Sequence, residues 1–349
     1  MQFSKMVTVV GAHAEGEIGR VITAGLLVRP GMTMLERLNW LNDEADHIRR
    51  FCLFEPRGAA QMTVNLLTPP SSPGADVGFI PMQGDGSHAM SGSNAMCVTT
   101  VLLETGMLEM REPETLVHLD TAAGLITATA ECAAGRVRSV TLDFLPSFAE
   151  ALDCTVEVPE IGPVRLDVAF GGVYYVLVDA RQFDLGIVPA NARTLVELGN
   201  RINRAAKEQL SVRHPVISQF DSIEFCMFTD VEDARNRIYR NATIMPPGRI
   251  DRSPCGTGTA ARLAVMSARG EISMGETVTM RSTIGSRFHA CVSGKTDIGA
   301  RAGISTRITG RAWIYGIHQL CVDPTDPFPT GFTMADTWGD GIDHQISDL

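Results

Sequence analysis

Cys255 stands where a polypeptide can best make a base of a thiol. It lies in the stretch Asp251-Arg-Ser-Pro-Cys255-Gly-Thr-Gly-Thr259, and the apolar, alanine-rich run that follows is typical of a helix. Ser253 or Asp251 can cap the start of this helix, and Pro254 suits its first turn. The unpaired N–H groups and partial positive charge of a helix N-terminus lower the pKa of a thiol and also bind a carboxylate. The segment therefore predicts a reactive, partly exposed thiol beside a small anion.

A second segment has the same plan. Ala89-Met-Ser91-Gly-Ser-Asn-Ala95 leads into another apolar helical run, and Ser91-Gly-Ser93 aligns with Cys255-Gly-Thr257, which matches nucleophile, glycine and hydroxyl in register. Two helix starts of this kind favour two related half-domains directed at one small anion. The alternative for Ser91 is a plain N-cap, which is the usual role of a serine before a helix.

The composition is that of an ordinary soluble globular protein. The chain has 349 residues, more than the usual single core, and its 44% apolar and 20% charged residues argue against the disordered and membrane classes. A net charge of −10 without a Lys/Arg cluster argues against nucleic-acid binding. The first residues lack the features of a signal peptide, and no apolar run reaches transmembrane length. We expect a cytoplasmic protein of two domains, without nucleic-acid or membrane partners.

The eight cysteines of the sequence form neither a Cys-x-x-Cys pair nor a Cys/His metal spacing. Most of them lie in apolar surroundings, as Cys226 and Cys291 do, and Cys97 is expected to face the core. Without a secretory signal, a reducing compartment is the better inference. The sequence also lacks the Gly-x-Gly-x-x-Gly and P-loop patterns, so we expect neither a metal nor an organic cofactor.

The alternation of apolar and polar residues indicates an α+β chain with many short strands. Strands are expected at 7–11, 21–27, 116–120, 125–131, 137–143, 168–179, 223–230 and 278–281. Helices are expected at 31–40, 96–106, 194–210 and 260–270. The run 168–179 is interrupted by glycines, and a boundary between two halves is expected near 146–148.

These motifs resemble those of the proline racemase superfamily. The stretch around Cys255 matches the catalytic signature of the family almost without change. Met90-Ser-Gly-Ser-Asn94 matches its first signature, which reads Met-Cys-Gly-His in the racemases and 4-hydroxyproline epimerases. Gly11-Ala-His-Ala-Glu-Gly-Glu17 is similar to the entry strand of the family, and the likeness continues to Pro329, so that it covers nearly the whole chain.

The resemblance implies the diaminopimelate-epimerase-like fold. In this fold two similar half-domains each wrap a curved, mostly antiparallel sheet around a central helix, and the substrate lies between them. Residues 1–148 would form the half-domain that carries the Ser91 motif, and residues 326–349 would return to it. Residues 149–325 would form the half-domain that carries Cys255.

The resemblance also implies roles for individual residues. Ser91 and Cys255 would be the acid/base pair on either side of the substrate Cα. Asp251 would accept a hydrogen bond from the ring nitrogen of the substrate, with a cap before the helix as its alternative role. Contacts to the substrate carboxylate would come from Gly92, Ser93, Gly256 and Thr257. No metal or cofactor is implied, because two opposed helix N-termini can stabilise the enediolate that forms when the Cα proton leaves.

Ser91 stands where the racemases have a cysteine, and Ser93 where they have a histidine. Racemisation needs a base on each face of Cα, and a serine hydroxyl is a far weaker acid than a thiol, whose ordinary pKa is about 8.5. Elimination from one face needs a single base, and in trans-3-hydroxy-L-proline the Cα–H and the hydroxyl share a ring face. We therefore expect dehydration of trans-3-hydroxy-L-proline to Δ1-pyrroline-2-carboxylate. The subgroup associated with this reaction often has threonine at the position of Cys255, however, and this keeps an alternative open.

The alternative is a hydroxyproline 2-epimerase that acts on 4- or 3-hydroxyproline, alone or together with dehydration. A proline racemase is less favoured. A non-catalytic protein that only binds a proline-like ligand is also less favoured, because a retired site has no need of the Cys255 thiol. In every case the partner is a small molecule, a hydroxyproline, and a homodimer is an expectation that no sequence feature decides.

Overall fold

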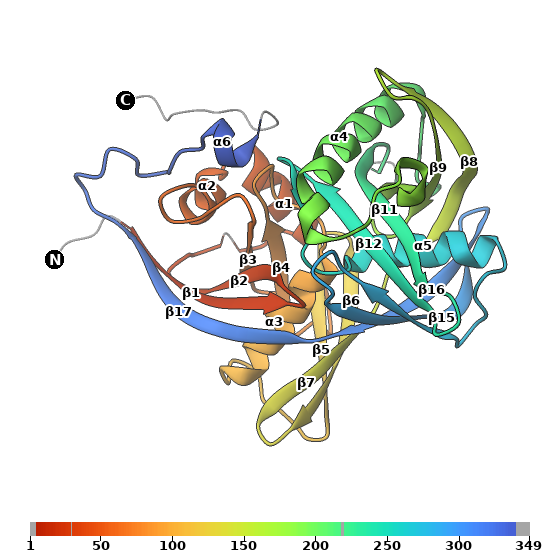
Figure 1. Cartoon of the computed structure of the whole chain (residues 1–349). Coiled ribbons are helices and arrows are strands. Elements are labelled where there is room, and N and C mark those ends of the chain that lie inside the picture. Colours follow the sequence, from red (N-terminus) through yellow and green to blue (C-terminus); the bar gives the residue numbers. More distant parts are fainter. Residues whose placement is uncertain (1–4, 29, 218–219, 340–349) are drawn as a thin grey trace. The chain divides into compact units, whose positions relative to one another are not determined.

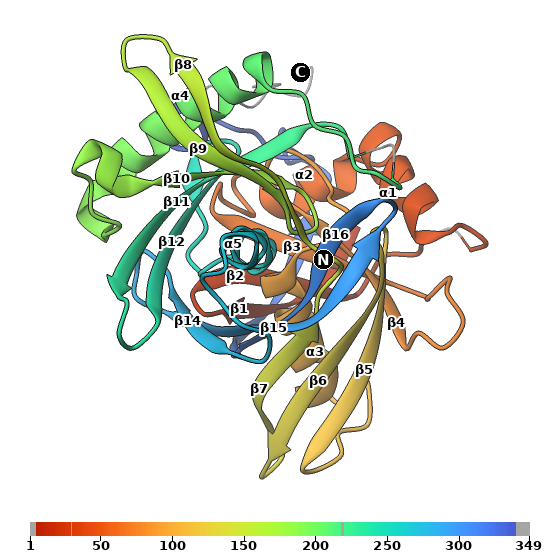
Figure 2. The same ribbon diagram turned by 90° about the vertical axis from the view of Figure 1, so that its right-hand side faces the viewer.

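The computed structural model describes residues 5–28, 30–217 and 220–339. The chain divides into two compact units, unit 1 (Met1–Leu142 with Arg311–Leu349) and unit 2 (Asp143–Gly310), and both are α+β with far more strand than helix (Figures 1 and 2). The division comes a few residues before the expected boundary at 148/149. The return to unit 1 also comes earlier than the expected residue 326, because it begins with a whole strand.

Unit 1 is a sheet in the order β17-β1-β2-β3-β4-β5-β6-β7, antiparallel except for the parallel pairs β2–β3 and β4–β5. Its strands are β1 (Lys5–Ala14), β2 (Glu17–Ala24), β3 (Met62–Thr68), β4 (Val77–Met82), β5 (Glu114–Thr121), β6 (Gly124–Ala133), β7 (Arg136–Asp143) and β17 (Ala312–Val322). Its helices are α1 (Met34–Asp43), α2 (His47–Leu53), α3 (Gly92–Glu104) and α6 (Ala335–Trp338).

Unit 2 is a sheet in the order β8-β9-β10-β11-β12-β14-β15-β16, antiparallel except for the parallel pairs β10–β11 and β12–β14. Its strands are β8 (Phe148–Val158), β9 (Gly162–Phe170), β10 (Tyr174–Asp179), β11 (Ile223–Asp233), β12 (Ile238–Met245), β13 (Arg249–Ile250), β14 (Thr277–Arg281), β15 (Arg287–Ile298) and β16 (Arg301–Gly310). Its helices are α4 (Ala192–Gln209) and α5 (Gly256–Ala268), with 3-10 turns at Ala180–Phe183 and Pro189–Asn191. The sequence of antiparallel and parallel pairs is the one found in unit 1.

Each sheet is curved around one apolar helix. In unit 1, α3 packs against β17, β1, β2 and β6, and its residues from Gly92 to Leu103 are buried. In unit 2, α5 packs against β8, β9, β10, β15 and β16, and Figure 2 shows it end-on with the strands around it. The central helix follows the fifth strand of each sheet order, which is β4 in unit 1 and β12, with the short β13 after it, in unit 2. It is therefore surrounded by strands rather than laid on a surface.

Strand β10 shows why the sheet of unit 2 has helices on both faces. Tyr174, Val176 and Val178 are buried in a cluster with residues of α4, whereas Tyr175 and Leu177 are buried in a second cluster with residues of α5. Successive side chains of a strand point to opposite faces, so a run of apolar residues on both parities needs a cover on each side. The helix α4 supplies one cover and the central helix α5 the other.

The expected strands and helices are found, but the helix expected at 31–40 spans Met34–Asp43 and the strand expected at 21–27 ends at Ala24. Two further corrections concern the glycines. The run 168–179 is two antiparallel strands, β9 and β10, joined by a turn at Gly171-Gly172, and not a single interrupted strand. The helices expected from 96 and 260 begin earlier, at Gly92 and Gly256, because glycine, which disfavours a helix by propensity, is used here in the first turn where the sheet comes close.

Gly171 is required by this close approach. A Cβ built on it would lie 2.2 Å from the carbonyl oxygen of Thr257 and 2.5 Å from the backbone nitrogen of Ala261, both in α5. Distances this short demand a shift of the backbone of the helix or of the turn. A Cβ built in the same way on Gly294, in β15, would have its nearest neighbour, the Cβ of Ser305, 3.9 Å away.

We predict that Gly171→Ala lowers the free energy of unfolding by about 2 kcal/mol or more, because overpacking of a core against backbone is not relieved by a change of rotamer. Gly294→Ala is the matched control and should change stability by less than about 0.5 kcal/mol. Denaturant unfolding of both variants measures this. Equal stability of the two variants would contradict the close contact.

Candidate active site

Cys255 is itself the N-cap of α5. Its Sγ accepts a hydrogen bond from the backbone N–H of Gly258 at 3.4 Å. Ser253 and Asp251, the caps expected from the sequence, instead form the turn before the helix: Asp251 accepts from the backbone N–H and the hydroxyl of Ser253, each at 2.8 Å. The Ser253 hydroxyl in turn accepts from the backbone N–H of Cys255 at 3.1 Å. Pro254 therefore precedes the helix and is not in its first turn.

This turn holds Cys255 in a conformation that few side chains adopt. Its φ is +65°, and a non-glycine residue in this region carries about 1–3 kcal/mol of strain. Asn241 of β12 also holds this turn. Its side-chain amide donates to the carbonyl of Pro254 at 3.0 Å and to the hydroxyl of Thr259 at 3.2 Å. The backbone around the thiol is thus fixed by hydrogen bonds on both sides.

Tyr175 of β10 is a site residue that the sequence analysis missed. Its hydroxyl lies 2.6 Å from the Thr257 hydroxyl and 3.4 Å from the Cys255 Sγ, and the tyrosine is completely buried. A thiolate can only accept a hydrogen bond, so Tyr175 donates to the deprotonated Cys255, and this interaction lowers the pKa of the thiol. Tyr175 could not be assigned to the site from the sequence, because it is 80 residues away from Cys255 and fits the pattern of an apolar residue in a buried strand.

The thiol is less exposed and less acidic than expected. Cys255 is 6% exposed, and burial together with the nearby carboxylate of Asp251 raises its pKa to about 12. Hydrogen bonds from Tyr175 and the Gly258 N–H act in the opposite direction but do not outweigh burial. The expectation of a partly exposed thiol with a lowered pKa is therefore wrong, because burial of the helix start could not be read from the motif.

In unit 1, Ser91 precedes the first turn of α3. Within the described part of the chain its side chain makes no capping hydrogen bond, so the plain N-cap is not the role the structure shows. The Ser91 Oγ instead accepts a hydrogen bond from the side-chain amide of Asn94 at 2.8 Å and lies 3.5 Å from the Ser93 Oγ. Ser91 is half-buried, and Gly92, Ser93 and Asn94 are buried.

The predicted site residues thus form one group in each unit. Ser91, Gly92 and Ser93 lie together at the start of α3. Asp251, Cys255, Gly256 and Thr257 lie together at the start of α5. Tyr175, Asn241 and Asn94 contact these groups and were not predicted, and Asn65 is linked to the first group through Asn94.

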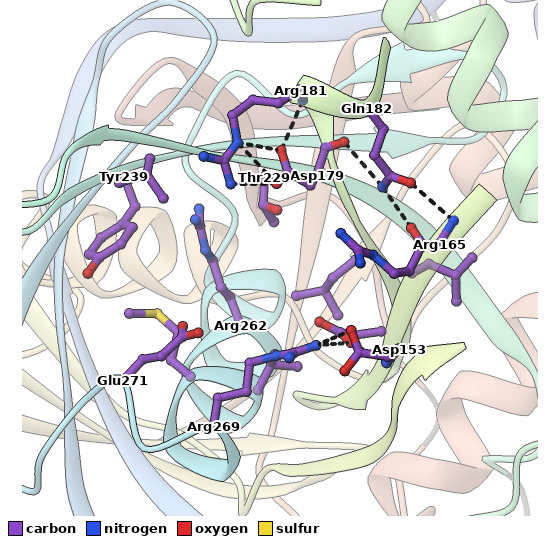
Figure 3. A pocket seen from close by; sticks show the side chains of 16 residues that line it. Asp153, Arg165, Asp179, Arg181, Gln182, Thr229, Tyr239, Arg262, Arg269 and Glu271 are labelled. Carbon is purple, nitrogen blue, oxygen red and sulfur yellow. Dashed lines mark hydrogen bonds and ion pairs between the residues drawn. The ribbon is translucent and has the colours of Figure 1, made fainter. Parts of the chain in front are cut away.

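A cavity of about 350 Å³ in unit 2 lies at the other end of α5 (Figure 3). Its wall is charged but largely paired: Arg269 bonds to Asp153 and Asp167, and Arg181 to Asp179. Arg262 also lines this cavity, and burial lowers its pKa to about 10. This cavity does not include the residues of the Cys255 group.

Arg262 links the cavity wall to the support of Cys255. Its guanidinium donates to the backbone carbonyls of Arg240 and Asp230 and, at 2.7 Å, to the side-chain oxygen of Asn241. Asn241 in turn holds the carbonyl of Pro254. The buried arginine therefore ties β11, β12 and α5 together and orients the amide on which the Cys255 turn rests.

Among residues 5–28, 30–217 and 220–339, no three His, Cys, Asp or Glu side chains are grouped as a metal site requires. No helix in this part of the chain is long and apolar enough to cross a membrane.

The family follows from comparison with known proteins. Residues 9–333 match the family described as proline racemase, and the chain belongs to that family. It is 45% identical over 341 residues to the 4-hydroxyproline 2-epimerase of Agrobacterium fabrum (strain C58 / ATCC 33970), with 97% of this chain and 98% of the relative covered. The identity to the 4-hydroxyproline 2-epimerase of Allorhizobium ampelinum (strain ATCC BAA-846 / DSM 112012 / S4) is 46%, with the same coverage.

Solved structures give the same result. The crystal structure of a hydroxyproline epimerase from Agrobacterium vitis, with bound trans-4-OH-L-proline, superposes with a TM-score of 0.92 at 45% identity and covers 98% of this chain and 99% of that chain. A PhzF-family phenazine biosynthesis protein of Bacillus anthracis has a TM-score of 0.55 at 11% identity, over 90% of this chain and 99% of that one. The second likeness shows a shared fold alone.

We predict that iodoacetamide at near-neutral pH modifies the partly exposed Cys154, Cys291 and Cys321 before Cys255. Because the pKa of Cys255 is about 12, its rate of alkylation should still be rising at about pH 10. Peptide mass spectrometry across a pH series measures both. A rate for Cys255 that levels off near the ordinary thiol pKa of about 8.5 would show that burial does not control it.

Tyr175→Phe should move this profile to still higher pH, because it removes the hydroxyl that donates to the thiol. Tyr174→Phe is the matched control. Its hydroxyl, on the same strand, bonds to Glu150 at 3.2 Å and its ring faces α4, so the profile of Cys255 should not change.

Proposed function

We propose that the protein is a hydroxyproline 2-epimerase and that 4-hydroxyproline is its substrate. The observation that carries this proposal is the match, over nearly the whole chain, to relatives named 4-hydroxyproline 2-epimerase and to a hydroxyproline epimerase with bound trans-4-OH-L-proline. These findings favour the epimerase, the alternative kept open by the sequence, over the dehydration of trans-3-hydroxy-L-proline that the serine at position 91 led us to expect.

In the proposed reaction Ser91 and Cys255 act on opposite faces of the substrate Cα. One group takes the Cα proton, the electron pair moves into the carboxylate to form an enediolate, and the other group returns a proton to the opposite face. Each direction therefore needs one deprotonated and one protonated group. Cys255, protonated near neutral pH because its pKa is raised, is ready for the donating role.

The two helix starts would stabilise the enediolate. The first N–H groups of a helix have no acceptor within it, and their partial positive charge favours an anion. We assign this role to the backbones of Gly92 and Ser93 in α3 and of Gly256 and Thr257 in α5. The Thr257 hydroxyl is already hydrogen-bonded to Tyr175, so its backbone N–H is the better candidate for contact with the carboxylate.

Asp251 has two roles in this proposal. Its observed hydrogen bonds to Ser253 hold the turn before the helix, while Cys255 is the cap, so the alternative of a capping Asp251 is not what the structure shows. A carboxylate can accept more hydrogen bonds than these two, and its effect on the pKa of Cys255 places it near the thiol. We therefore keep the contact to the ring nitrogen of the substrate as a proposal.

We further propose that units 1 and 2 are the two half-domains of a duplicated chain with the diaminopimelate-epimerase-like fold. The support is the order of strand pairing, which is the same in both sheets, and the position of α3 and α5 after the fifth strand of that order. The cytoplasmic location and the homodimer stay proposals that rest on the sequence.

We predict that the purified protein interconverts trans-4-hydroxy-L-proline and cis-4-hydroxy-D-proline, and that its activity on L-proline and on trans-3-hydroxy-L-proline is at least about tenfold lower. Polarimetry for the epimers and an assay for Δ1-pyrroline-2-carboxylate distinguish the reactions. If trans-3-hydroxy-L-proline is dehydrated efficiently and 4-hydroxyproline is left unchanged, the dehydratase is the correct assignment. Binding of 4-hydroxyproline without exchange of its Cα proton would instead identify a non-catalytic binder.

Cys255→Ala should abolish epimerisation, because no other group would exchange a proton on that face of Cα. Cys226→Ala is the matched control: this cysteine is also buried in unit 2 but packs in the cluster beside α4. It should keep turnover close to the wild-type value. Turnover by Cys255→Ala would overturn the mechanism.

A further inference from the structure

The two proposed bases are hydrogen-bonded in different ways at the same position of the motif. In the register that aligns Ser91 with Cys255, Asn94 aligns with Gly258. Asn94 donates its side-chain amide to the Ser91 Oγ at 2.8 Å, whereas Gly258 donates its backbone N–H to the Cys255 Sγ at 3.4 Å. A Cβ at Gly258 would lie 2.8 Å from the Met227 Sδ and 3.1 Å from the thiol, so a side chain has no room there.

The direction of the hydrogen bond to Ser91 is fixed by a chain of buried amides. The carbonyl of Arg20 can only accept, so Asn65 turns its NH₂ group toward it, at 3.0 Å. The second N–H of the same group donates to the Asn94 Oδ1 at 2.8 Å. Asn94 is thereby left with its own NH₂ facing Ser91, and the serine oxygen must accept.

The position of Asn94 is fixed as well as its orientation. Asn65 is completely buried and Asn94 is 1% exposed. On the side of β2, a Cβ on Gly19 would come within 2.6 Å of the Asn94 Oδ1 and 2.9 Å of the Cys97 Sγ. The amide is therefore enclosed by β2, β3 and its own helix, and it cannot turn away from Ser91.

We propose that Asn94 is the positioning residue that makes the Ser91 hydroxyl a working acid/base, by donating a fixed hydrogen bond to its oxygen. This rests on the proposed function, in which Ser91 exchanges a proton with Cα. When Ser91 takes that proton its oxygen begins as an alkoxide, and a fixed N–H donor stabilises the negative charge. When Ser91 gives a proton, the same donor occupies a lone pair of the oxygen and leaves the O–H free to point at Cα.

The thiol of Cys255 has less need of such a donor, since a thiolate forms far more readily than an alkoxide. This explains why a serine can stand at one helix start without a matching change at the other. A serine at this position with an apolar residue in place of Asn94 would be an N-cap and nothing more.

The test compares Asn94→Ala and Asn94→Asp with Ser91→Ala, in the full-length protein in deuterium oxide. Asn94→Ala should lower epimerisation at least about tenfold, in line with the loss of one hydrogen bond to a charged group. The Asp variant keeps the acceptor for Asn65 but offers no N–H, and it should be impaired as strongly. Thr99→Ala is the control, because the hydroxyl of this buried residue of the same helix donates to the carbonyl of Ala95, and its loss should leave the rate unchanged.

A loss of positioning is distinguished from a damaged fold by proton exchange. One epimer presents its Cα–H to Cys255, and its deuterium uptake without epimerisation should continue near the wild-type rate in both Asn94→Ala and Ser91→Ala. A structural defect would lower exchange and epimerisation together. A second readout is the effect of Asn94→Ala in a Ser91→Cys background. There it should lower activity much less than it does in the wild-type protein, because a thiol does not depend on the hydrogen bond from Asn94.

The outcomes separate the two proposals. Loss of epimerisation in Ser91→Ala with full activity in Asn94→Ala would overturn the role of Asn94 alone. Equal losses on Asn94→Ala in the serine and cysteine backgrounds would also overturn it. Absence of epimerisation by the wild-type protein, or full activity of Ser91→Ala, would instead overturn the proposed function.

Discussion

A helix enclosed by strands along its whole length has backbone N–H groups at its start that nothing within the helix can satisfy. In α5 the residues from Gly256 to Met266 are buried, and α3 is buried to the same extent. Buried polar groups must find partners, so the chain before each helix and the first turn itself must be polar and closely fitted. The polar groups of the site are therefore gathered at the two helix starts, where the fold buries backbone N–H groups that need partners.

The demand is met differently in the two units. At the start of α5 a thiol, a carboxylate and a phenol are packed together, and the thiol closes the first turn as its cap. At the start of α3 the side chain that comes first is not the cap, and side-chain amides from β3 and from the helix fill the space around it. The asymmetry of the two groups is thus built from the second layer of residues as much as from Ser91 and Cys255 themselves.

The local parts of this arrangement could be predicted from the sequence. Cys255 and Ser91 lie in short polar motifs before apolar runs, and the strands from β5 to β7 alternate clearly, so helix starts and half-buried strands followed from periodicity. Tyr175 and Asn65 could not be found in this way. They come to the site on strands β10 and β3, and only the strand order brings them beside the motifs.

The pKa of the thiol could not be predicted from the sequence either, because it depends on burial. A motif shows which groups can titrate, but the pKa of Cys255 depends on how much protein covers it, and this decided the direction. Asn94 lies inside the motif and was passed over, because an asparagine in the first turn of a helix is common. Its meaning depends on Gly19 and Asn65, which are distant in sequence.

The return of the last strand has a consequence for synthesis of the chain on the ribosome. Strand β17 pairs with β1 from Lys5↔Val322 to Ala14↔Ala312, so that one edge of β1 has no partner from its own unit until the residues after 311 have emerged. Unit 2, which is continuous from Asp143 to Gly310, has all its strands before that point. The first unit to begin is therefore the last to be completed, and the nascent chain carries an open sheet edge through the synthesis of the whole second unit.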